Sequence, residues 1–377
     1  MIYLDHAATT PLPEAVADTM YDVLRHQFGN PSAQYPLGRE AKELVEEARR
    51  TIAGALGCQP LALHFTSCGT ESDNWAIRAA AWQGRHTGRH IITTAVEHSA
   101  VLEPCRQLEQ EGYEVTYLKP DRTGHISAGQ VAEALREDTV LVSVMLVNNE
   151  TGCLFPVADI ARLLKERGSR ALLHCDAVQG FLKVPCNPAG WGVDLMSLSA
   201  HKIGGPKGIG ALYVRPDLRN LRPLLAGGGQ EEGLRSGTEA TAQIAGFAKA
   251  VALRQEGLEE KLAHMARIKA YCRERLLSIP GVVPVGGGEA PHILAVSLVG
   301  YPSANVINDL GSQGICLSAG SACHRGKASR GYAALGLDKR TAAGVLRLSF
   351  GPETTEGDID ALYEALLRHK NTRFSML

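Results

Sequence analysis

The feature that most constrains the fold is an alternation of strand-like and helix-like patterns over roughly the first 215 residues. Short apolar runs, typical of strands buried on both faces of a parallel sheet, occur at residues 61–66, 90–96, 140–147 and 171–175. Amphipathic segments with helical spacing lie between or beside them, at residues 39–56, 101–111, 131–136 and 160–167. This alternation predicts crossover connections and an α/β fold with a mainly parallel sheet. Such sheets bind ligands at the carboxyl ends of their strands, which is where the polar motifs of this chain fall.

The remainder of the chain predicts a second, smaller unit. From about residue 240 to residue 279 the pattern is almost continuously helical, with a break near Gly257. There follow a strand at 293–299, a helix at 304–310, a loop that contains Cys323, a strand at 345–350 and a helix at 359–369. We therefore expect two domains joined by the long helix. They are a large domain over residues 14–257, and a small α+β domain formed by residues 1–13 and 258–377.

The composition excludes several functional classes. With 45% apolar residues the 377-residue chain can bury a large core, and its net charge of −1 offers no footprint for nucleic acid or an anionic membrane. No apolar run approaches the ~18 residues of a membrane span, and the first residues do not resemble a signal peptide. Nine cysteines, an odd number without a CxxC pair, predict free thiols, no metal site and a cytoplasmic location.

One lysine has neighbours suited to a cofactor. Lys202 stands in the run Ser199-Ala200-His201-Lys202-Ile203-Gly204-Gly205. An arbitrary lysine is usually a solvated charge, but here a hydroxyl, an imidazole and glycines surround the amine. Pyridoxal phosphate needs an amine for its aldehyde, an acid for its ring nitrogen, a group that stacks on the ring, and a phosphate cup. Lys202 would supply the amine, and Ser199 and His201 would donate to the phosphate.

Two further motifs fit the ring and the phosphate. Asp176 ends an apolar run and could keep the pyridine nitrogen protonated, while Gln179 could donate to the ring hydroxyl. The ordinary alternative for such an aspartate is a turn or helix cap. Gly69 and Thr70 follow another strand at the start of a helix, where backbone N–H groups bind phosphate. The alternative for this motif is an ordinary capping box.

Three other polar residues point to the cofactor or a substrate. His98 follows a strand and could stack on the ring and carry protons, although a lone histidine is usually structural. Asn149, also after a strand, could contact the ring hydroxyl or a substrate carboxylate. Arg347 is a charge within an apolar strand pattern and would bind an amino-acid carboxylate through its fork, unless an internal salt bridge satisfies it.

Cys323 is the candidate nucleophile. It lies in the run Gly320-Ser321-Ala322-Cys323-His324-Arg325-Gly326-Lys327, where positive neighbours favour the thiolate. Cys175, in an apolar strand, and Cys272, on a helix, are better interpreted as inert core residues.

In this order, the motifs closely resemble those of the cysteine desulfurases, class V aminotransferases of the pyridoxal-phosphate fold type I. The resemblance spans nearly the whole chain, from Tyr3-Leu4-Asp5-His6-Ala7-Ala8-Thr9-Thr10 to Gly320-Ser321-Ala322-Cys323, and includes Arg235-Ser236-Gly237-Thr238. It implies a seven-stranded type of sheet and a homodimer in which Thr238 reaches the partner subunit's phosphate. It also implies that Lys202 carries the cofactor, Asp176 pairs with the ring nitrogen and Gln179 bonds the ring hydroxyl. His98 would stack on the ring, and the phosphate would be held by Gly69, Thr70, Ser199 and His201.

Several positions depart from the common family pattern. Cys68 stands where a glycine is usual, and His6 and Gly205 each replace a common tyrosine. The loop after Cys323 is about two residues shorter than in related sequences. The tail after the last predicted helix is short, whereas in some relatives a longer tail helps to dock the iron–sulfur scaffold.

The resemblance implies removal of sulfur from L-cysteine, giving L-alanine and a persulfide on Cys323 for a sulfur-acceptor protein. Arg347 and Asn149 would hold the substrate carboxylate, Lys202 would remove the α-proton, and His98 would handle the thiol proton. A selenocysteine lyase, a class V aminotransferase and a non-catalytic sulfur-relay protein are the alternatives. The acceptor could serve iron–sulfur assembly, tRNA thiolation or cofactor synthesis.

Overall fold

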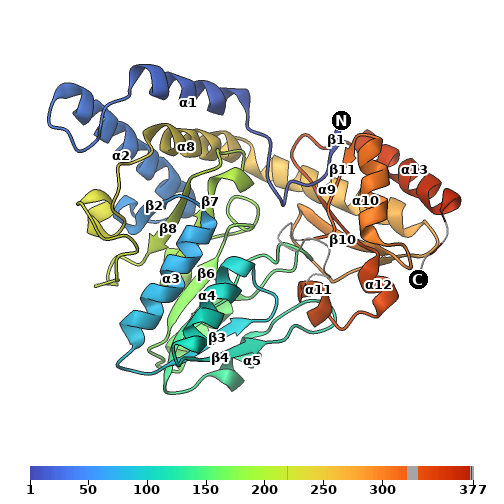
Figure 1. Cartoon of the computed structure of the whole chain (residues 1–377), viewed down its shortest axis with the longest axis horizontal. Coiled ribbons are helices and arrows are strands. Elements are labelled where there is room, and N and C mark those ends of the chain that lie inside the picture. The colour runs from blue at the N-terminus through green and yellow to red at the C-terminus, as the bar shows by residue number, and fades with distance from the viewer. Residues whose placement is uncertain (219, 321–329, 374, 376–377) are drawn as a thin grey trace.

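The computed structural model describes residues 1–218, 220–320, 330–373 and 375 (Figure 1). Its largest element is a seven-stranded sheet with the strand order β2-β8-β7-β6-β5-β3-β4. Strands β4, β3, β5, β6 and β7 run parallel to one another, and β8 is antiparallel to both β7 and β2. The strands are β2 (Leu63–Thr66), β3 (His90–Thr94), β4 (Glu114–Leu118), β5 (Thr139–Ser143), β6 (Leu172–Asp176), β7 (Leu195–Ser199) and β8 (Gly210–Val214). The predicted mainly parallel, seven-stranded sheet is confirmed.

Helices cover both faces of this sheet. Successive strand residues point to opposite faces, so a pair such as Ile91 and Ile92 packs into two different apolar clusters. One cluster includes residues of α3 (Gly69–Gly84) and α4 (Ser99–Gln110), and the other includes residues of α2 (Pro36–Leu56), α6 (Val157–Glu166) and α8 (Thr241–Gln255). Burial on both faces explains why the strands read as continuous apolar runs.

The second unit is built on a three-stranded antiparallel sheet with the order β12-β10-β9. Its strands are β9 (Val282–Pro284), β10 (Ile293–Leu298) and β12 (Val345–Ser349). Residues of α9 (Leu258–Leu277), α10 (Ser303–Ser312) and α13 (Glu356–Thr372) pack with them in one apolar cluster. Helix α8 ends at Gln255 and α9 begins at Leu258, so the predicted break near Gly257 is confirmed.

The N-terminus joins this second unit. Strand β1 (Ile2–Tyr3) pairs in parallel with β11 (Ile315–Cys316), and Asp5 forms a bridge with Ser349 beside β12. The chain then passes to α1 (Glu14–His26), which packs on α8. We retain residues 14–257, and residues 1–13 with 258–377, as the proposed domains.

None of the helices in the described chain is both long and apolar enough to cross a membrane. Seven short elements complete the described chain. They are α5 (Ala128–Ala134), α7 (Pro188–Trp191), α11 (Arg330–Ala334) and α12 (Lys339–Ala343), with three 3-10 turns η1 (Pro60–Ala62), η2 (Ala200–Lys202) and η3 (Gln230–Gly233).

Candidate active site

A cavity of about 240 Å³ lies at the carboxyl ends of the parallel strands, against the N-terminal segment. Its wall contains every predicted site residue that the structure describes except Thr238. The lining residues are Ala7, Ala8, Cys68, Gly69, Thr70, Asp73, His98, Met145, Val147, Asn149, Asp176, Val178, Gln179, Ser199, His201, Lys202 and Arg347. Thr238 is exposed and does not line the cavity of its own chain, and Cys323 lies outside the described residues.

Lys202 enters the cavity from the turn η2, directly after β7. Its amine donates hydrogen bonds to the backbone carbonyls of Ala7, at 2.7 Å, and Ala8, at 2.9 Å. These carbonyls belong to the N-terminal segment, so the amine is positioned by residues nearly two hundred places earlier in the chain. Thr10 reinforces this contact, because its hydroxyl donates to the His201 carbonyl at 2.8 Å and accepts from the Gly204 N–H at 2.7 Å.

Asp176 stands at the end of β6 on the same side of the sheet. One carboxylate oxygen accepts the Val178 N–H at 2.9 Å, and the residue is buried. Burial raises the pKa of Asp176 above its ordinary value, and the nearby His98 and Lys202 oppose that shift. A cationic group placed beside this carboxylate would therefore stabilise its charged form.

Both ends of the Gln179 amide already have partners within the chain. The amide nitrogen donates to the Ala7 carbonyl at 2.7 Å, and the oxygen accepts from the Lys183 amine at 3.2 Å. The Ala7 carbonyl thus receives donors from both Gln179 and Lys202, which links the two side chains through one backbone oxygen.

His98 is the N-cap residue of α4. Its Nδ1 accepts a hydrogen bond from the Ala100 N–H at 3.1 Å, so a neutral ring carries its proton on Nε2. The capping contact fixes the orientation of the ring in the cavity wall, and it leaves Nε2 as the nitrogen that can exchange a proton there.

The opposite end of the cavity offers an anion cup. It combines the N-terminus of the 16-residue helix α3, where Gly69 and Thr70 lie, with the Ser199 hydroxyl, which is buried and has no partner. A Cβ at Gly69 would come within 2.7 Å of the Val178 side chain, so only glycine allows this approach. Burial lowers the pKa of His201 to about 4, which leaves its ring neutral at physiological pH.

This donor set fits pyridoxal phosphate. An unpartnered buried hydroxyl and a helix N-terminus suit the phosphate, and a carboxylate and an amine lie in the same cavity for the ring nitrogen and the aldehyde.

Comparisons with known proteins agree with this geometry. The family model "Aminotransferase class-V" matches residues 2–362. A Bacillus subtilis protein named putative cysteine desulfurase IscS 1 is 41% identical over 93% of both chains, and a cysteine desulfurase IscS from Methanosarcina thermophila is 37% identical over 97% of this chain and 91% of its own. The chain belongs to the class V aminotransferase family, among its cysteine desulfurases.

Solved structures extend the likeness to three dimensions. A NifS-like protein superposes with a TM-score of 0.93 at 35% identity, covering 99% of this chain and 100% of its own. A protein named SspA, solved in complex with cysteine, gives a TM-score of 0.81 at 35% identity, over 94% of this chain and 100% of its own. The predicted fold type I is confirmed, and proteins of this cysteine desulfurase family use pyridoxal phosphate.

In this family member, the structure bears on one of the two interpretations that the sequence left open for Arg347, the internal salt bridge. It is 2% exposed and lies in the middle of β12, and its side chain donates to the Asp5 carboxylate and to the Asn149 carbonyl, each at 2.8 Å. An internal ion pair therefore exists. Arg347 also lines the cavity, and its Nε is buried without an acceptor.

The desulfurase cavity also contains one acidic residue and a thiol to which motif analysis assigns no role. Asp73, on the buried face of α3, has a pKa raised well above its ordinary value by burial and by Asp176. The only sequence signal for it is an acid among apolar helix positions. Cys68, noted above as a departure from the family pattern, is the N-cap of α3 and lines the cavity half-buried.

Proposed function

We propose that this chain is a pyridoxal-phosphate-dependent cysteine desulfurase, which converts L-cysteine to L-alanine and loads the sulfur onto Cys323 as a persulfide. The observation that carries the proposal is the single cavity in which Lys202, Asp176, His98 and Arg347 meet in a chain of this family. The structural relative solved with cysteine supports the choice of substrate.

The residues of the cavity divide between the two ends of the cofactor. When bound, the cofactor supplies an aldehyde that takes up amines and an aromatic ring that accepts electrons from a substrate carbanion. Lys202 would hold the aldehyde, Asp176 would pair with the ring nitrogen, and His98 would stack on the ring. Ser199, His201 and the backbone of Gly69 and Thr70 would hold the phosphate, and Gln179 would bond the ring hydroxyl through a rearranged amide.

Substrate binding and proton transfer then fall to four side chains. Arg347 and Asn149 bind the cysteine carboxylate, for which Asp5 is the internal competitor. Lys202 removes the α-proton. His98 handles the thiol proton, and in its neutral form it presents an N–H donor at Nε2, because its Nδ1 lone pair is used by the Ala100 N–H.

The sulfur transfer balances without a further reagent. The thiolate of Cys323 bonds to the substrate sulfur while the substrate Cβ–S bond breaks. The electron pair of that bond stays on the carbon skeleton, which takes up a proton and leaves as alanine. Cys323 is left as the persulfide, ready for an acceptor thiol.

The described start of the cysteine loop supports this assignment. Ser318 exchanges backbone hydrogen bonds with Arg347 in the cavity wall, at 2.7 and 3.3 Å. Two residues later, Gly320 has a φ of +124°, and a Cβ there would meet Tyr332 at 3.0 Å and Glu150 at 3.2 Å. Cys323 follows Gly320 by three residues in the sequence.

The test is to treat the purified enzyme with L-cysteine and to measure alanine, sulfide and the site of added sulfur by mass spectrometry. We expect equal amounts of alanine and transferred sulfur, with the added sulfur on Cys323. Cys323→Ser should keep the bound cofactor and lose sulfur release, whereas Cys68→Ser should keep most activity. Added sulfur that maps to Cys68, with Cys323 unmodified, would overturn the assignment.

The same assay separates the alternative functions. A keto acid in place of alanine would indicate an aminotransferase, and a rate on selenocysteine far above that on cysteine would indicate a selenocysteine lyase. Absence of any turnover despite bound cofactor would indicate a relay protein.

We also infer a homodimer, a sulfur-acceptor protein as partner and a cytoplasmic location. The exposed position of Thr238 supports a contact with a second subunit. The eight described cysteines are all free, which supports a reducing compartment.

A further inference from the structure

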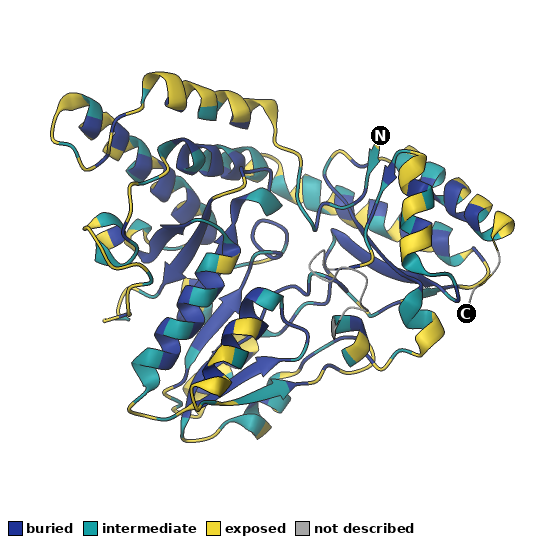
Figure 2. Cartoon of the chain, in the orientation of Figure 1, coloured by how far each residue is buried: buried dark blue, intermediate teal, exposed yellow. Residues whose placement is uncertain are grey.

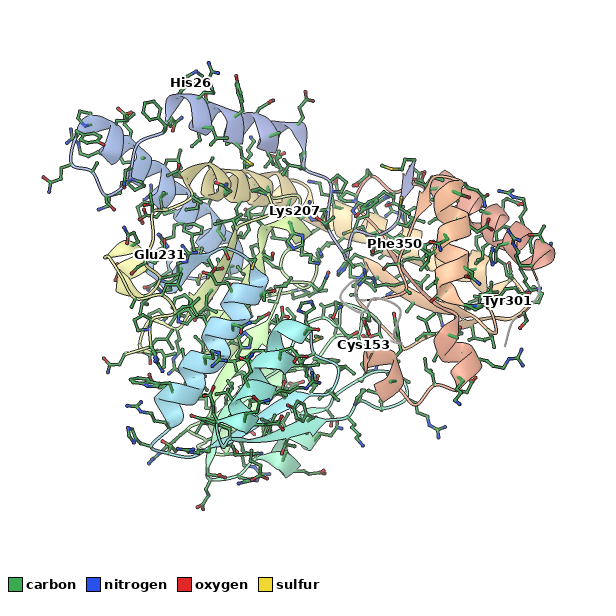
Figure 3. The ribbon with its side chains drawn as sticks, in the orientation of Figure 1. His26, Cys153, Lys207, Glu231, Tyr301 and Phe350 are labelled. Carbon is green, nitrogen blue, oxygen red and sulfur yellow. The ribbon has the colours of Figure 1, made fainter. Side chains whose placement is uncertain are left out.

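A second cavity, of about 330 Å³, meets the first at Lys202, the one described residue that lines both. We call it the rear cavity and define it by Lys183, Lys202, Arg254, Lys261, His292 and Phe350. Phe350, which follows β12, is labelled in Figure 3 on the side of the second unit that faces the large sheet. The reaction proposed above makes no use of this space.

Lys183 contributes a buried amine to the rear cavity. It is 3% exposed, and its amine donates to the Gln179 amide oxygen at 3.2 Å. Among the described residues it has no carboxylate partner. Burial, with Arg254 and Lys202 nearby, holds the pKa of Lys183 well below its ordinary value. An ammonium at this position thus lacks the counter-ion that buried charges normally have.

Arg254 adds a permanent charge from the last turn of α8. Its guanidinium makes only long contacts, to the Leu182 carbonyl at 3.5 Å and to the Met265 sulfur at 3.7 Å. It is half-buried and, within the described chain, is not ion-paired with a carboxylate. Because a guanidinium stays protonated in proteins, this charge cannot be removed by loss of a proton.

His292 provides the second observation that points to a ligand. It is 1% exposed, lines the rear cavity just before β10, and has no hydrogen-bond partner at either ring nitrogen. A neutral imidazole always carries one N–H, so His292 has a buried N–H donor without a hydrogen-bond acceptor. Burial and the neighbouring cations hold the pKa of His292 well below its ordinary value, so the ring stays neutral.

No acid of the rear cavity that the structure describes forms a direct ion pair with these groups. Glu353 has a side chain that is 60% exposed, it lies 3.4 Å from His6, and its charge acts on Arg254 without a direct contact. Glu256 is exposed, and its backbone carbonyl accepts from the Lys261 amine. The depth of the cavity therefore combines two buried or half-buried cationic side chains with an unused imidazole N–H.

We propose that the rear cavity binds a small oxyanion, either a carboxylate or an inorganic phosphate or sulfate. Its oxygens would accept from Lys183, Arg254 and His292, which removes the desolvation penalty that these groups carry when unpaired. The volume holds such an anion with water around it. The site lies beyond the cofactor cavity and does not depend on the reaction.

The experiment uses the enzyme saturated with its cofactor, so that added phosphate cannot enter the cofactor's own phosphate cup. Thermal unfolding and isothermal titration calorimetry are measured with sodium phosphate, sulfate and succinate, each against sodium chloride at equal ionic strength. We expect a saturable rise in Tm and measurable heats with at least one oxyanion. Comparing the Tm shifts and heats measured with phosphate and sulfate to those measured with succinate identifies whether an inorganic oxyanion or a carboxylate binds.

Two variants and a matched control localise the effect. Arg254→Met and His292→Leu should each weaken the oxyanion-induced shift at least tenfold in apparent affinity. Lys249→Met removes a positive charge from the same helix but outside the cavity lining, and it should leave the shift unchanged. Without added anion, Arg254→Met should unfold at the same or a higher temperature, because a poorly compensated charge is removed. The proposal is overturned if no oxyanion raises Tm above the chloride control, or if both variants keep the full shift.

Discussion

At the scale of single residues, Arg347 shows how a charge is held inside an apolar strand. Its partners are Asp5 from the N-terminal segment and the Asn149 carbonyl from a turn that follows β5. The planar guanidinium can face both and still present an N–H to a ligand, which the ammonium of a lysine cannot do with the same geometry.

We therefore expect Arg347→Lys to raise KM for L-cysteine roughly 10- to 100-fold, the range that loss of a charge-assisted hydrogen bond gives, with a smaller effect on kcat. Steady-state kinetics measure this. Asp5→Asn is the control, because it removes the competing charge and should not raise KM. An unchanged KM in Arg347→Lys would mean that the arginine serves only the internal ion pair.

Lys202 is the second residue with a direct test. Lys202→Ala should abolish the borohydride-reducible link between protein and cofactor, because the amine is the only group proposed to carry it. Lys207→Ala, which removes an exposed lysine five residues later, should leave the link intact. Peptide mapping by mass spectrometry after reduction decides the matter, and a link found on another lysine would contradict the assignment.

The residues of the cofactor motifs could be predicted because their chemistry is local. Lys202 and Gly69 each have neighbours in sequence that indicate a phosphate-bearing ligand. Asp73 could not be assigned in this way, because its raised pKa comes from burial and from Asp176, a residue on another element. The unpartnered ring nitrogens of His292 could not be predicted from the sequence either, since only the folded chain shows that no hydrogen-bond partner surrounds them.

At the scale of elements, Glu97 ties the turn between β3 and α4 to the chain beyond β5. One carboxyl oxygen accepts from the Thr94 hydroxyl at 2.8 Å and from the Met145 N–H at 3.0 Å, and the other is buried without a partner. Burial raises the pKa of Glu97 to about 8. The folded protein thus keeps a proton here that the unfolded chain releases near pH 4.5.

The sign of the pH dependence follows from that difference. The stability that neutral Glu97 contributes is fully present below pH 4.5 and is lost as the pH rises through about 8. Glu97→Gln keeps an oxygen acceptor and cannot ionise, so its free energy of unfolding should exceed that of the wild type at pH 9, by an amount on the order of a few kcal/mol. Urea unfolding at pH 5, 7 and 9 measures the difference, which should shrink toward pH 5. A difference independent of pH would contradict the raised pKa.

The strand–helix alternation predicts β2, β3, β5 and β6, whereas β4, β7, β8 and α1 are not among the predicted segments. Strand β8 is antiparallel to β7 and follows it with the three-residue turn η2 as the only element between them, so the alternating pattern does not lead to it. Helix α1 lies outside the predicted segments and buries only Val16 and Val23. Its position comes from packing against α8, a contact that sequence periodicity does not encode.

At the scale of the whole molecule, exposed apolar side chains gather around α1 and the start of α2. Tyr21, Leu24, Phe28 and Tyr35 are each more than half exposed, and the outer side of α1 is largely exposed (Figure 2). A group of this kind is typical of a surface that another protein covers, which supports the proposed homodimer.

We expect Leu24→Glu to weaken the dimer, because it places a charge within the apolar contact. Sedimentation velocity should show a shift toward monomer at micromolar concentration and a matching loss of activity. Lys165→Glu, a charge reversal on an exposed position of α6, should sediment as the wild type does. A wild-type enzyme that is monomeric and fully active would contradict the dimer.

The contacts of the first eight residues have a consequence for how the enzyme is made in the cell. Strand β1 pairs with β11, the Ala7 N–H donates to the Ser349 hydroxyl at 2.8 Å, and the Ala7 and Ala8 carbonyls receive the amine of Lys202. The N-terminus leaves the ribosome first, yet its pairing partners are synthesised some three hundred residues later, which takes roughly 15 to 60 s at ordinary rates of translation. The large sheet can form in the meantime, but the Ala7 and Ala8 carbonyls are held in place beside Lys202 only after translation has passed β12.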